Sequence, residues 1–258
     1  MTARALLVRG LVAGLLAGLA TFLVAHQVGE PQVETAISLE ESAVHHHAHV
    51  DSQAHSHDPG HEAVVSRGTQ RTWGLLTGSL AVGLALGGLV ALGSALAIGR
   101  VGRLGATATT AVVALEGFVA VALVPFLKYP ANPPGVGSAE TIGARTEDYF
   151  SFLLVSVLAA VAATVLAARA WPRIGSWGAV VLGAAAYVVV VAAAGALMPT
   201  VNEVGSFPAD TLWAFRRSSL LTLAALWATI GIVLSGLVGH LEQREAAATR
   251  RRALAASL

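Results

Sequence analysis

The sequence predicts an all-α fold, a polytopic integral membrane bundle of about six transmembrane helices with both termini cytoplasmic. Of the 258 residues, 55% are apolar and only 12% are charged, and the mean hydropathy is +0.69, whereas soluble domains carry roughly 25% charged residues. A hydrocarbon core about 30 Å thick requires a run of roughly 20 apolar residues in a helix. Six segments meet that length: residues 10–28, 73–99, 104–127, 150–168, 174–198 and 218–239. We therefore predict a single membrane domain over residues 1–258.

The first segment admits a second interpretation, because two arginines before an apolar run are also typical of a cleavable signal peptide. Its length, the lack of a clear cleavage site and a regular glycine spacing favour a retained helix. Gly10, Gly14 and Gly18 lie on one helix face, where they allow a neighbouring helix to approach closely. The second segment repeats this spacing at Gly74 and Gly78 and at Gly83 and Gly87.

The distribution of charge predicts the orientation of the bundle. Ten of the sixteen basic residues are near the N-terminus, in two short connections or in the C-terminal tail: Arg4, Arg9, Arg100, Arg103, Arg169, Arg173, Arg244, Arg250, Arg251 and Arg252. The three long connections hold twelve of the fifteen acidic residues. By the positive-inside rule both termini are cytoplasmic, including a basic tail over residues 240–258, and the long connections are extracytoplasmic.

A histidine-rich stretch follows the first segment. Residues 29–72 are predicted to form an extracytoplasmic loop that is partly disordered, because the stretch is rich in Ala, Ser and His. Neutral imidazole is the commonest ligand for divalent transition metals. We expect the loop to capture such ions by weak, exchangeable binding. Its histidines are His45, His46, His47, His49, His55, His57 and His61.

A second group of candidate metal ligands lies at the end of the first segment. His26, Glu30 and Glu34 are four residues apart, so they stand on one face if the helix continues past Pro31 with a kink. An imidazole and two carboxylates suit a divalent cation. The alternative is a solvated helix end whose polar groups have no ligand.

Two further connections carry unusual residues. After the third segment, residues 124–137 read VPFLKYPANPPGVG, a proline- and glycine-rich run that predicts rigid, non-helical backbone. After the fifth, Asn202 and Glu203 offer oxygen ligands directly beyond a helix-ending proline. Trp213, Phe215 and Arg216 are interpreted as an interfacial anchor.

Glu116 is the one ionisable residue predicted to lie within the membrane. It is near the middle of the third segment, among valine, leucine and phenylalanine residues, where a bare carboxylate is costly. Such a residue is expected to face the bundle interior, as a cation ligand or a proton carrier. The alternative is a protonated carboxyl that hydrogen-bonds a serine or threonine of a neighbouring helix.

Several classes of protein are disfavoured by what the sequence lacks. The chain has no cysteine, which excludes thiolate metal sites and disulfides. It has no phosphate-binding loop and no H-E-x-x-H pattern, which disfavours a nucleotide-driven motor and a membrane metalloenzyme. The arginines of the tail are too few and too close to the membrane to indicate nucleic-acid binding. A transporter and a non-transporting metal-binding, sensing or assembly subunit both remain open.

The connections together resemble those of the CbtA family of predicted cobalt transporter subunits. The resemblance extends from the first segment to the last, and the proline-asparagine run of residues 124–137 is its most specific part. The other matching pieces are Gly29-Glu30-Pro31, the histidine-rich stretch, Asn202-Glu203-Val204, Phe207-Pro208, Leu212-Trp213 and Phe215-Arg216.

This resemblance implies a multi-pass protein of the bacterial cytoplasmic membrane that takes up Co²⁺ in connection with cobalamin metabolism. It also implies a small single-helix partner subunit, CbtB, alongside the lipid bilayer and the metal ion. No fixed cofactor is implied, and no set of transport residues comes with the family. Imidazole and carboxylate ligands do not distinguish Co²⁺ from Ni²⁺ or Zn²⁺, so cobalt rests on the resemblance.

Overall fold

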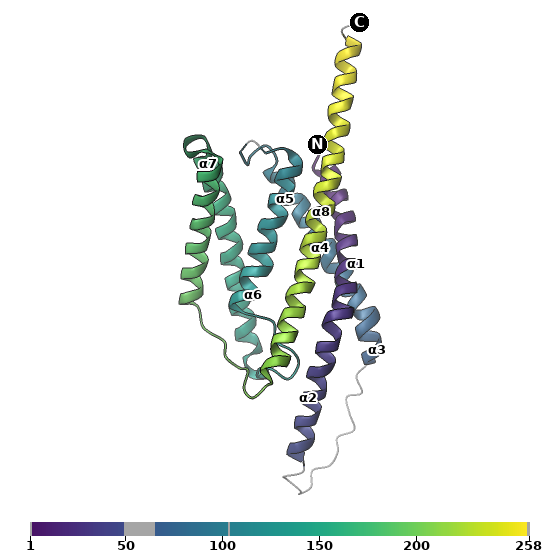
Figure 1. Ribbon diagram of the computed structural model, residues 1–258, viewed down its shortest axis with the longest axis vertical. Helices are drawn as coiled ribbons and strands as arrows, with labels where there is room; N and C mark the ends of the chain where they lie inside the picture. The colour runs from purple at the N-terminus through teal and green to yellow at the C-terminus, as the bar shows by residue number, and fades with distance from the viewer. Residues whose placement is uncertain (1, 49–64, 103, 257–258) are drawn as a thin grey trace.

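The computed structural model describes residues 2–48, 65–102 and 104–256, and every regular element in these ranges is a helix (Figure 1). Five of the helices are long and apolar enough to cross a membrane, which confirms the helical membrane class. The elements are α1 (Ala3–Val24), η1 (Ala25–Gly29), α2 (Glu30–Ala48), α3 (Arg67–Thr69), η2 (Gln70–Gly74), α4 (Leu75–Ala97), α5 (Ala106–Gly117), η3 (Phe118–Leu123), α6 (Val124–Lys128), η4 (Ala139–Thr141), α7 (Ile142–Leu197) and α8 (Ala209–Ala256).

Helix α7 accounts for the difference between five long helices and six predicted segments. It spans 56 residues, but its backbone leaves the helical region at Gly175, where φ is 75° and ψ is 174°. A positive φ is readily adopted only by glycine, and the chain reverses there into two arms (Figure 1). The arms pack together, because a Cβ added at Gly183 would lie 3.1 Å from the carbonyl oxygen of Ala163. They correspond to the fourth and fifth predicted segments.

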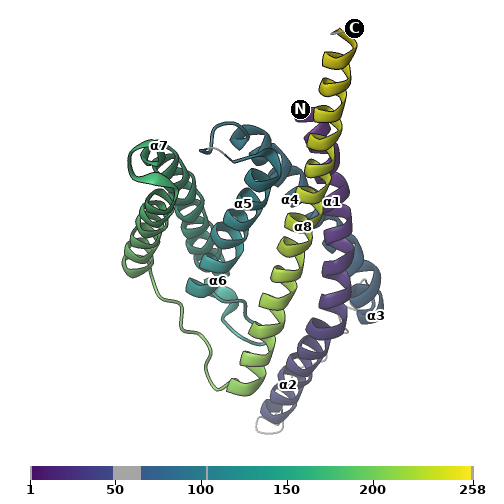
Figure 2. The same ribbon diagram turned by 45° about the horizontal axis from the view of Figure 1, so that its top comes forward.

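The bundle has two distinct ends. Both termini lie at one end, together with the turn over residues 98–102 and the reversal at Gly175, and we call this the terminal end (Figure 1). Residues 129–138 and 198–208 lie at the other, which we call the loop end (Figures 1 and 2). Helix α8 continues beyond the bundle at the terminal end (Figure 2). The side of the membrane that each end faces stays a prediction from the charge pattern.

Close backbone packing joins α1 to α4. Gly10, Gly14 and Gly18 face Gly83 and Gly87 across the interface, and a Cβ at Gly83 would lie 2.7 Å from the nitrogen of Gly18. The first predicted glycine stripe and half of the second are therefore packing surfaces. In the other half, a Cβ at Gly78 would meet nothing within 4 Å, and at Gly74 only a carbonyl of the preceding turn.

Helix α8 completes this core. Ile230, Leu234 and Val238 are fully buried in a cluster that includes residues of α1, α4 and α5. Trp227 packs on Gly117 of α5, where any added Cβ would overlap its ring. This packing fixes one side of α5 against α8.

Two helices pass through a proline by widening just before it. Pro31 follows η1 and Pro125 follows η3, and both are π-helical turns. A proline has no N–H and its ring crowds the preceding turn. In the wider turn the N–H of Glu30 donates to the carbonyl of Ala25, and that of Val124 to Val119. The first helix therefore continues past Pro31 into α2, which is the condition set for the predicted group of His26, Glu30 and Glu34.

We expect Gly83→Ala to destabilise the bundle by about 1–3 kcal/mol, because the new methyl group overlaps backbone that has no room to move. Thermal unfolding of the purified protein in detergent measures the effect. Gly78→Ala on the same helix is the matched control, because its methyl group meets nothing. Equal melting temperatures for the two variants would contradict the α1–α4 packing.

Candidate functional site

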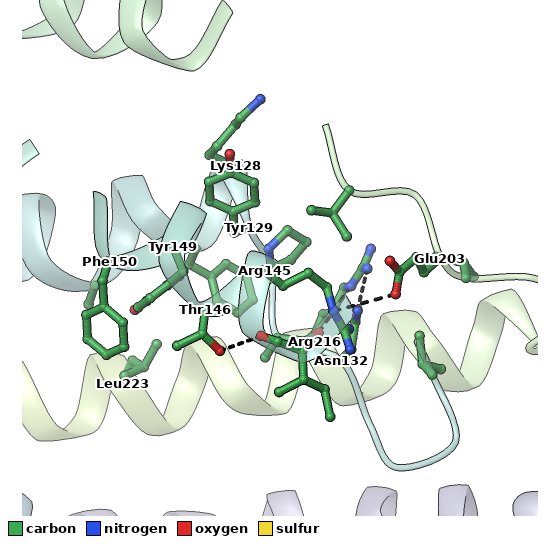
Figure 3. Close-up of a pocket in the computed structure, with 18 of the residues that line it drawn as sticks. Lys128, Tyr129, Asn132, Arg145, Thr146, Tyr149, Phe150, Glu203, Arg216 and Leu223 are labelled. Carbon is green, nitrogen blue, oxygen red and sulfur yellow. Dashed lines mark hydrogen bonds and ion pairs between the residues drawn. The ribbon is translucent and has the colours of Figure 1, made fainter. Parts of the chain in front are cut away.

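A cavity of about 580 Å³ lies at the loop end, and we call it the loop-end cavity (Figure 3). Residues 129–132, the beginning of α7, three residues of the connection that follows α7, and Arg216 and Leu223 of α8 all contribute to its wall. The cavity thus draws together segments from different parts of the chain. The polar and charged residues that line it are Lys128, Tyr129, Asn132, Arg145, Thr146, Tyr149, Glu203 and Arg216.

The first five residues of the proline-rich run form α6, so the prediction of non-helical backbone is wrong there and agrees with the structure only over residues 129–137. Lys128, the last residue of α6, and Tyr129, which follows it, hold the connection after α7. The ammonium of Lys128 donates to the carbonyl of Met198 at 3.2 Å, and the hydroxyl of Tyr129 donates to that of Pro199 at 2.9 Å. The Tyr129 ring also meets the buried Phe152 edge-on, with centroids 6.0 Å apart. The proline-rich run is therefore fixed to α7 at both arms.

Glu203 ties the second connection to the beginning of α7. Its carboxylate accepts the N–H of Ser138 at 3.1 Å and the hydroxyl of Thr141 at 2.9 Å, and it lies 3.5 Å from Nε of Arg145. These contacts lower the pKa of Glu203, with the Ser138 hydrogen bond as the largest cause. The residue was predicted as an oxygen ligand, and the structure places it in a hydrogen-bonded tether. Asn202 beside it is exposed and does not line the cavity.

Arg216 ties α8 to the proline-rich run. Its Nε donates to the carbonyl of Ala131 at 3.3 Å, and its Nη2 donates to Oδ1 of Asn132 at 2.9 Å. Both acceptors are neutral. The interfacial-anchor interpretation did not foresee that Arg216 reaches a cavity, and its match to the run at residues 131–132 gives no signal in the sequence alone.

A second cavity of about 490 Å³ contains Glu116, and we call it the Glu116 cavity. It lies between α5 and the two arms of α7, and its wall is almost entirely apolar. Val101, Leu104 and Trp171 line it toward the terminal end. The predicted position of Glu116, facing the inside of the bundle, agrees with this placement.

Thr164 of α7 is the hydrogen-bond partner of Glu116. Its hydroxyl lies 3.0 Å from both carboxyl oxygens and 2.9 Å from the carbonyl of Ala160. A hydroxyl has one proton to donate and lone pairs to accept another. Thr164 can therefore donate to an ionised Glu116, or accept a hydrogen bond from the O–H of a neutral Glu116 while its own hydroxyl donates to the carbonyl of Ala160. The pair serves both protonation states without a change of position.

A polar contact separates the two cavities. Ser156 is fully buried and donates to the carbonyl of Ala120 at 2.8 Å, and its oxygen lies 2.8 Å from the hydroxyl of Tyr187. Because the Ser156 proton is used on Ala120, Tyr187 donates to Ser156. Val121 lines the loop-end cavity, and Val119 and Tyr187 line the Glu116 cavity. The two cavities thus lie on either side of this contact, along the same helices.

The predicted group at the end of the first helix is held by arginines. Glu30 pairs with Arg67 at 2.6 Å, and Glu34 pairs with Arg71. The ring of His26 stacks on Phe22 with centroids 5.6 Å apart, and its Nδ1 lies 3.2 Å from the carbonyl of Arg71. The carboxylates are therefore neutralised by cations from α3 and η2.

The seven loop histidines lie beyond what can be compared with the structure. His45, His46 and His47 fall in the last turn of α2, with side chains outside the described part, and the others fall in residues 49–64, also outside it. Among the described residues, no group of three or more His, Cys, Asp or Glu side chains is arranged to hold a metal ion.

A bundle of helices long and apolar enough to cross a membrane, with two cavities along one helix interface, defines a polytopic membrane protein. The chain belongs to the CbtA family: the sequence model of this family, described as probable cobalt transporter subunit, matches residues 3–239. The family is one of transport subunits and not of enzymes. Comparison with curated proteins and comparison with solved structures each gave no match.

We expect Glu203→Gln to lower the melting temperature at pH 7, because the charged carboxylate holds Ser138, Thr141 and Arg145 together. Since the pKa of Glu203 is lowered on folding, its stabilisation is complete above the ordinary value of 4.5 and is lost as the pH falls through the folded-state value. Melting curves from pH 7 down to pH 3 should show the two proteins converging in acid. A difference in melting temperature that grows in acid would contradict the tether. Glu147→Gln is the control, because Glu147 is an exposed acid of α7.

Proposed function

We propose that this chain carries Co²⁺ inward across the bacterial cytoplasmic membrane, as part of an uptake system linked to cobalamin metabolism. Membership of the CbtA family supports cobalt as the metal and transport as the process. The observation that carries the mechanism is the position of Glu116, a carboxyl group in an apolar cavity between α5 and α7.

The proposed route follows the interface between α5–α6 and α7. Along these antiparallel helices the loop-end cavity, the Ser156–Ala120 contact and the Glu116 cavity succeed one another. The ion enters at the loop end, passes the level of Ser156 when the helices separate there, and reaches Glu116. It leaves near Trp171 at the terminal end. In this scheme the loop end is extracytoplasmic, as the positive-inside rule predicts.

Glu116 supplies the negative charge on this route. An ionised carboxylate attracts a divalent cation in a medium of low dielectric constant much more strongly than in water. When the cation leaves, the carboxylate takes up a proton, and the new O–H of Glu116 donates a hydrogen bond to the hydroxyl oxygen of Thr164. The exchange avoids leaving an unpaired charge in an apolar cavity.

The residues at the mouth of the route capture the ion in this proposal. The loop histidines from His45 to His61 raise the local metal concentration by exchangeable binding. His26, Glu30 and Glu34 receive the ion when Arg67 and Arg71 release the carboxylates. Ni²⁺ and Zn²⁺ would use the same ligands. A small single-helix subunit of the CbtB type is the proposed protein partner.

A second candidate is a membrane subunit that binds metal without transporting it. The buried Ser156 contact, which closes the interface between the cavities, favours this candidate. It predicts metal binding by the purified protein without movement of ions into vesicles. The two candidates therefore differ in one measurable quantity, the rate of metal influx.

We expect Glu116→Gln to lower the initial rate of radioactive cobalt uptake at least about tenfold, which corresponds to roughly 1.4 kcal/mol of lost stabilisation. Glutamine keeps a hydrogen-bonding group for Thr164 but carries no charge. Uptake is measured in cells and in vesicles that contain the purified protein.

Deletion of residues 45–61 should raise the metal concentration needed for half-maximal uptake and leave the maximal rate nearly unchanged.

Glu147→Gln is the control for this experiment, because Glu147 is an exposed acid of α7 that lines neither cavity. Uptake by Glu116→Gln at the wild-type rate would remove the proposed route. Wild-type vesicles that bind cobalt but take none up would favour the non-transporting subunit.

A further inference from the structure

We propose that the loop-end cavity binds an oxyanion, a carboxylate or phosphate group of a small molecule, between Arg145 and Arg216. For transport, this binding would mean that cobalt enters together with an anion and not as the free ion. That consequence rests on the proposed function. The binding itself does not depend on that function.

The first observation is the charge of the wall. Three cationic side chains line the cavity, Lys128, Arg145 and Arg216, and Glu203 is the one carboxylate in the lining, so the wall carries two excess positive charges. Figure 3 labels all four among the side chains around the cavity. A free divalent cation is repelled by such a wall, and an anion is attracted to it.

The second observation is that two of the cations hold only neutral acceptors. Arg216 donates to Ala131 and Asn132, and within the described residues its three remaining N–H groups have no acceptor. Lys128 donates to the carbonyl of Met198 and lies 5.3 Å from the centre of the Tyr129 ring. Neither side chain has a carboxylate partner in the described part of the chain, so both retain the capacity to bind an anion.

Arg145 contributes in a different way. Its Nη2 donates to the carbonyl of Ser138 at 2.9 Å, and its Nε lies 3.5 Å from Glu203. Glu203 is already the acceptor for Ser138 and Thr141. One carboxylate with three donors neutralises a single guanidinium at most, so the lining holds no second carboxylate for Arg216 or Lys128. Planar guanidinium groups bind carboxylate and phosphate through paired hydrogen bonds.

The rest of the wall describes the remainder of the ligand. Phe126, Phe150 and Leu223 supply apolar surface, and Thr146 and Tyr149 supply hydroxyl groups. A volume of about 580 Å³ is in the usual range for small-molecule sites. These features fit a compact organic anion with several oxygens. A phosphate-bearing lipid headgroup offers the same chemistry, because the cavity is at the end of a membrane bundle.

The test measures binding of metal-free citrate to the purified full-length protein in phosphatidylcholine nanodiscs, by calorimetry. We expect saturable binding to the wild type and at least about tenfold weaker binding to Arg216→Gln. Arg217→Gln is the matched control, because Arg217 is the next residue of α8 but is exposed and does not line the cavity. A second series uses nanodiscs that contain phosphatidylglycerol and measures whether this lipid stabilises the same proteins.

Each outcome decides the proposal. Citrate binding that needs Arg216 but not Arg217 supports a soluble anion, and stabilisation by phosphatidylglycerol with the same dependence supports a headgroup. The proposal is overturned if neither anion binds the wild type, or if the two arginine variants behave alike. Arg216→Lys guards against misfolding, because it keeps the charge and should retain more affinity than Arg216→Gln. Anion binding without cobalt influx would count against the proposed function alone.

Discussion

The hydrogen bond from Ser156 to the carbonyl of Ala120 fixes the level at which α7 meets the rest of the bundle. Helix α7 packs mainly on η3, α6 and η4, and cavities lie along the interface on either side of this contact. Ala120 belongs to the π-helical turn that precedes Pro125. Pro125 of α6 therefore shapes the backbone at the place where the proposed route is closed. On the other side of α5, Trp227 packs on Gly117 and holds the helix in place.

The helices could be predicted from the sequence because the hydrocarbon core imposes a length and an apolar composition on each of them. The residues at which the helices begin and end could not be predicted, because they depend on local backbone geometry. Glycine at position 175 permits a reversal without a loop, so two predicted segments appear as one element with two arms. The glycine spacing predicted a packing surface at Gly83 correctly but gave the same signal at Gly78, where no neighbour lies.

The candidate site also has features that the sequence predicts and others that it does not. A lone carboxyl group in an apolar run had to face the bundle interior, and Glu116 does. Ligand chemistry alone did not reveal that Glu30 and Glu34 meet arginines more than thirty positions away in the chain. Nor did it reveal that Arg216 and the run at residues 131–132 share one cavity. Such pairings are set by tertiary contacts, which no spacing along the chain encodes.

The proposed route has two halves, which open to opposite sides of the membrane and are closed from each other near Ser156. Because the chain has no cysteine, single cysteines can be introduced without background. Val121 lines the loop-end cavity and Ala163 lines the Glu116 cavity, so the variants Val121→Cys and Ala163→Cys place a thiol in each. A membrane-impermeant thiol reagent should modify the first from the extracytoplasmic side alone and the second from the cytoplasmic side alone. Modification of both positions from the same side would contradict the proposed route.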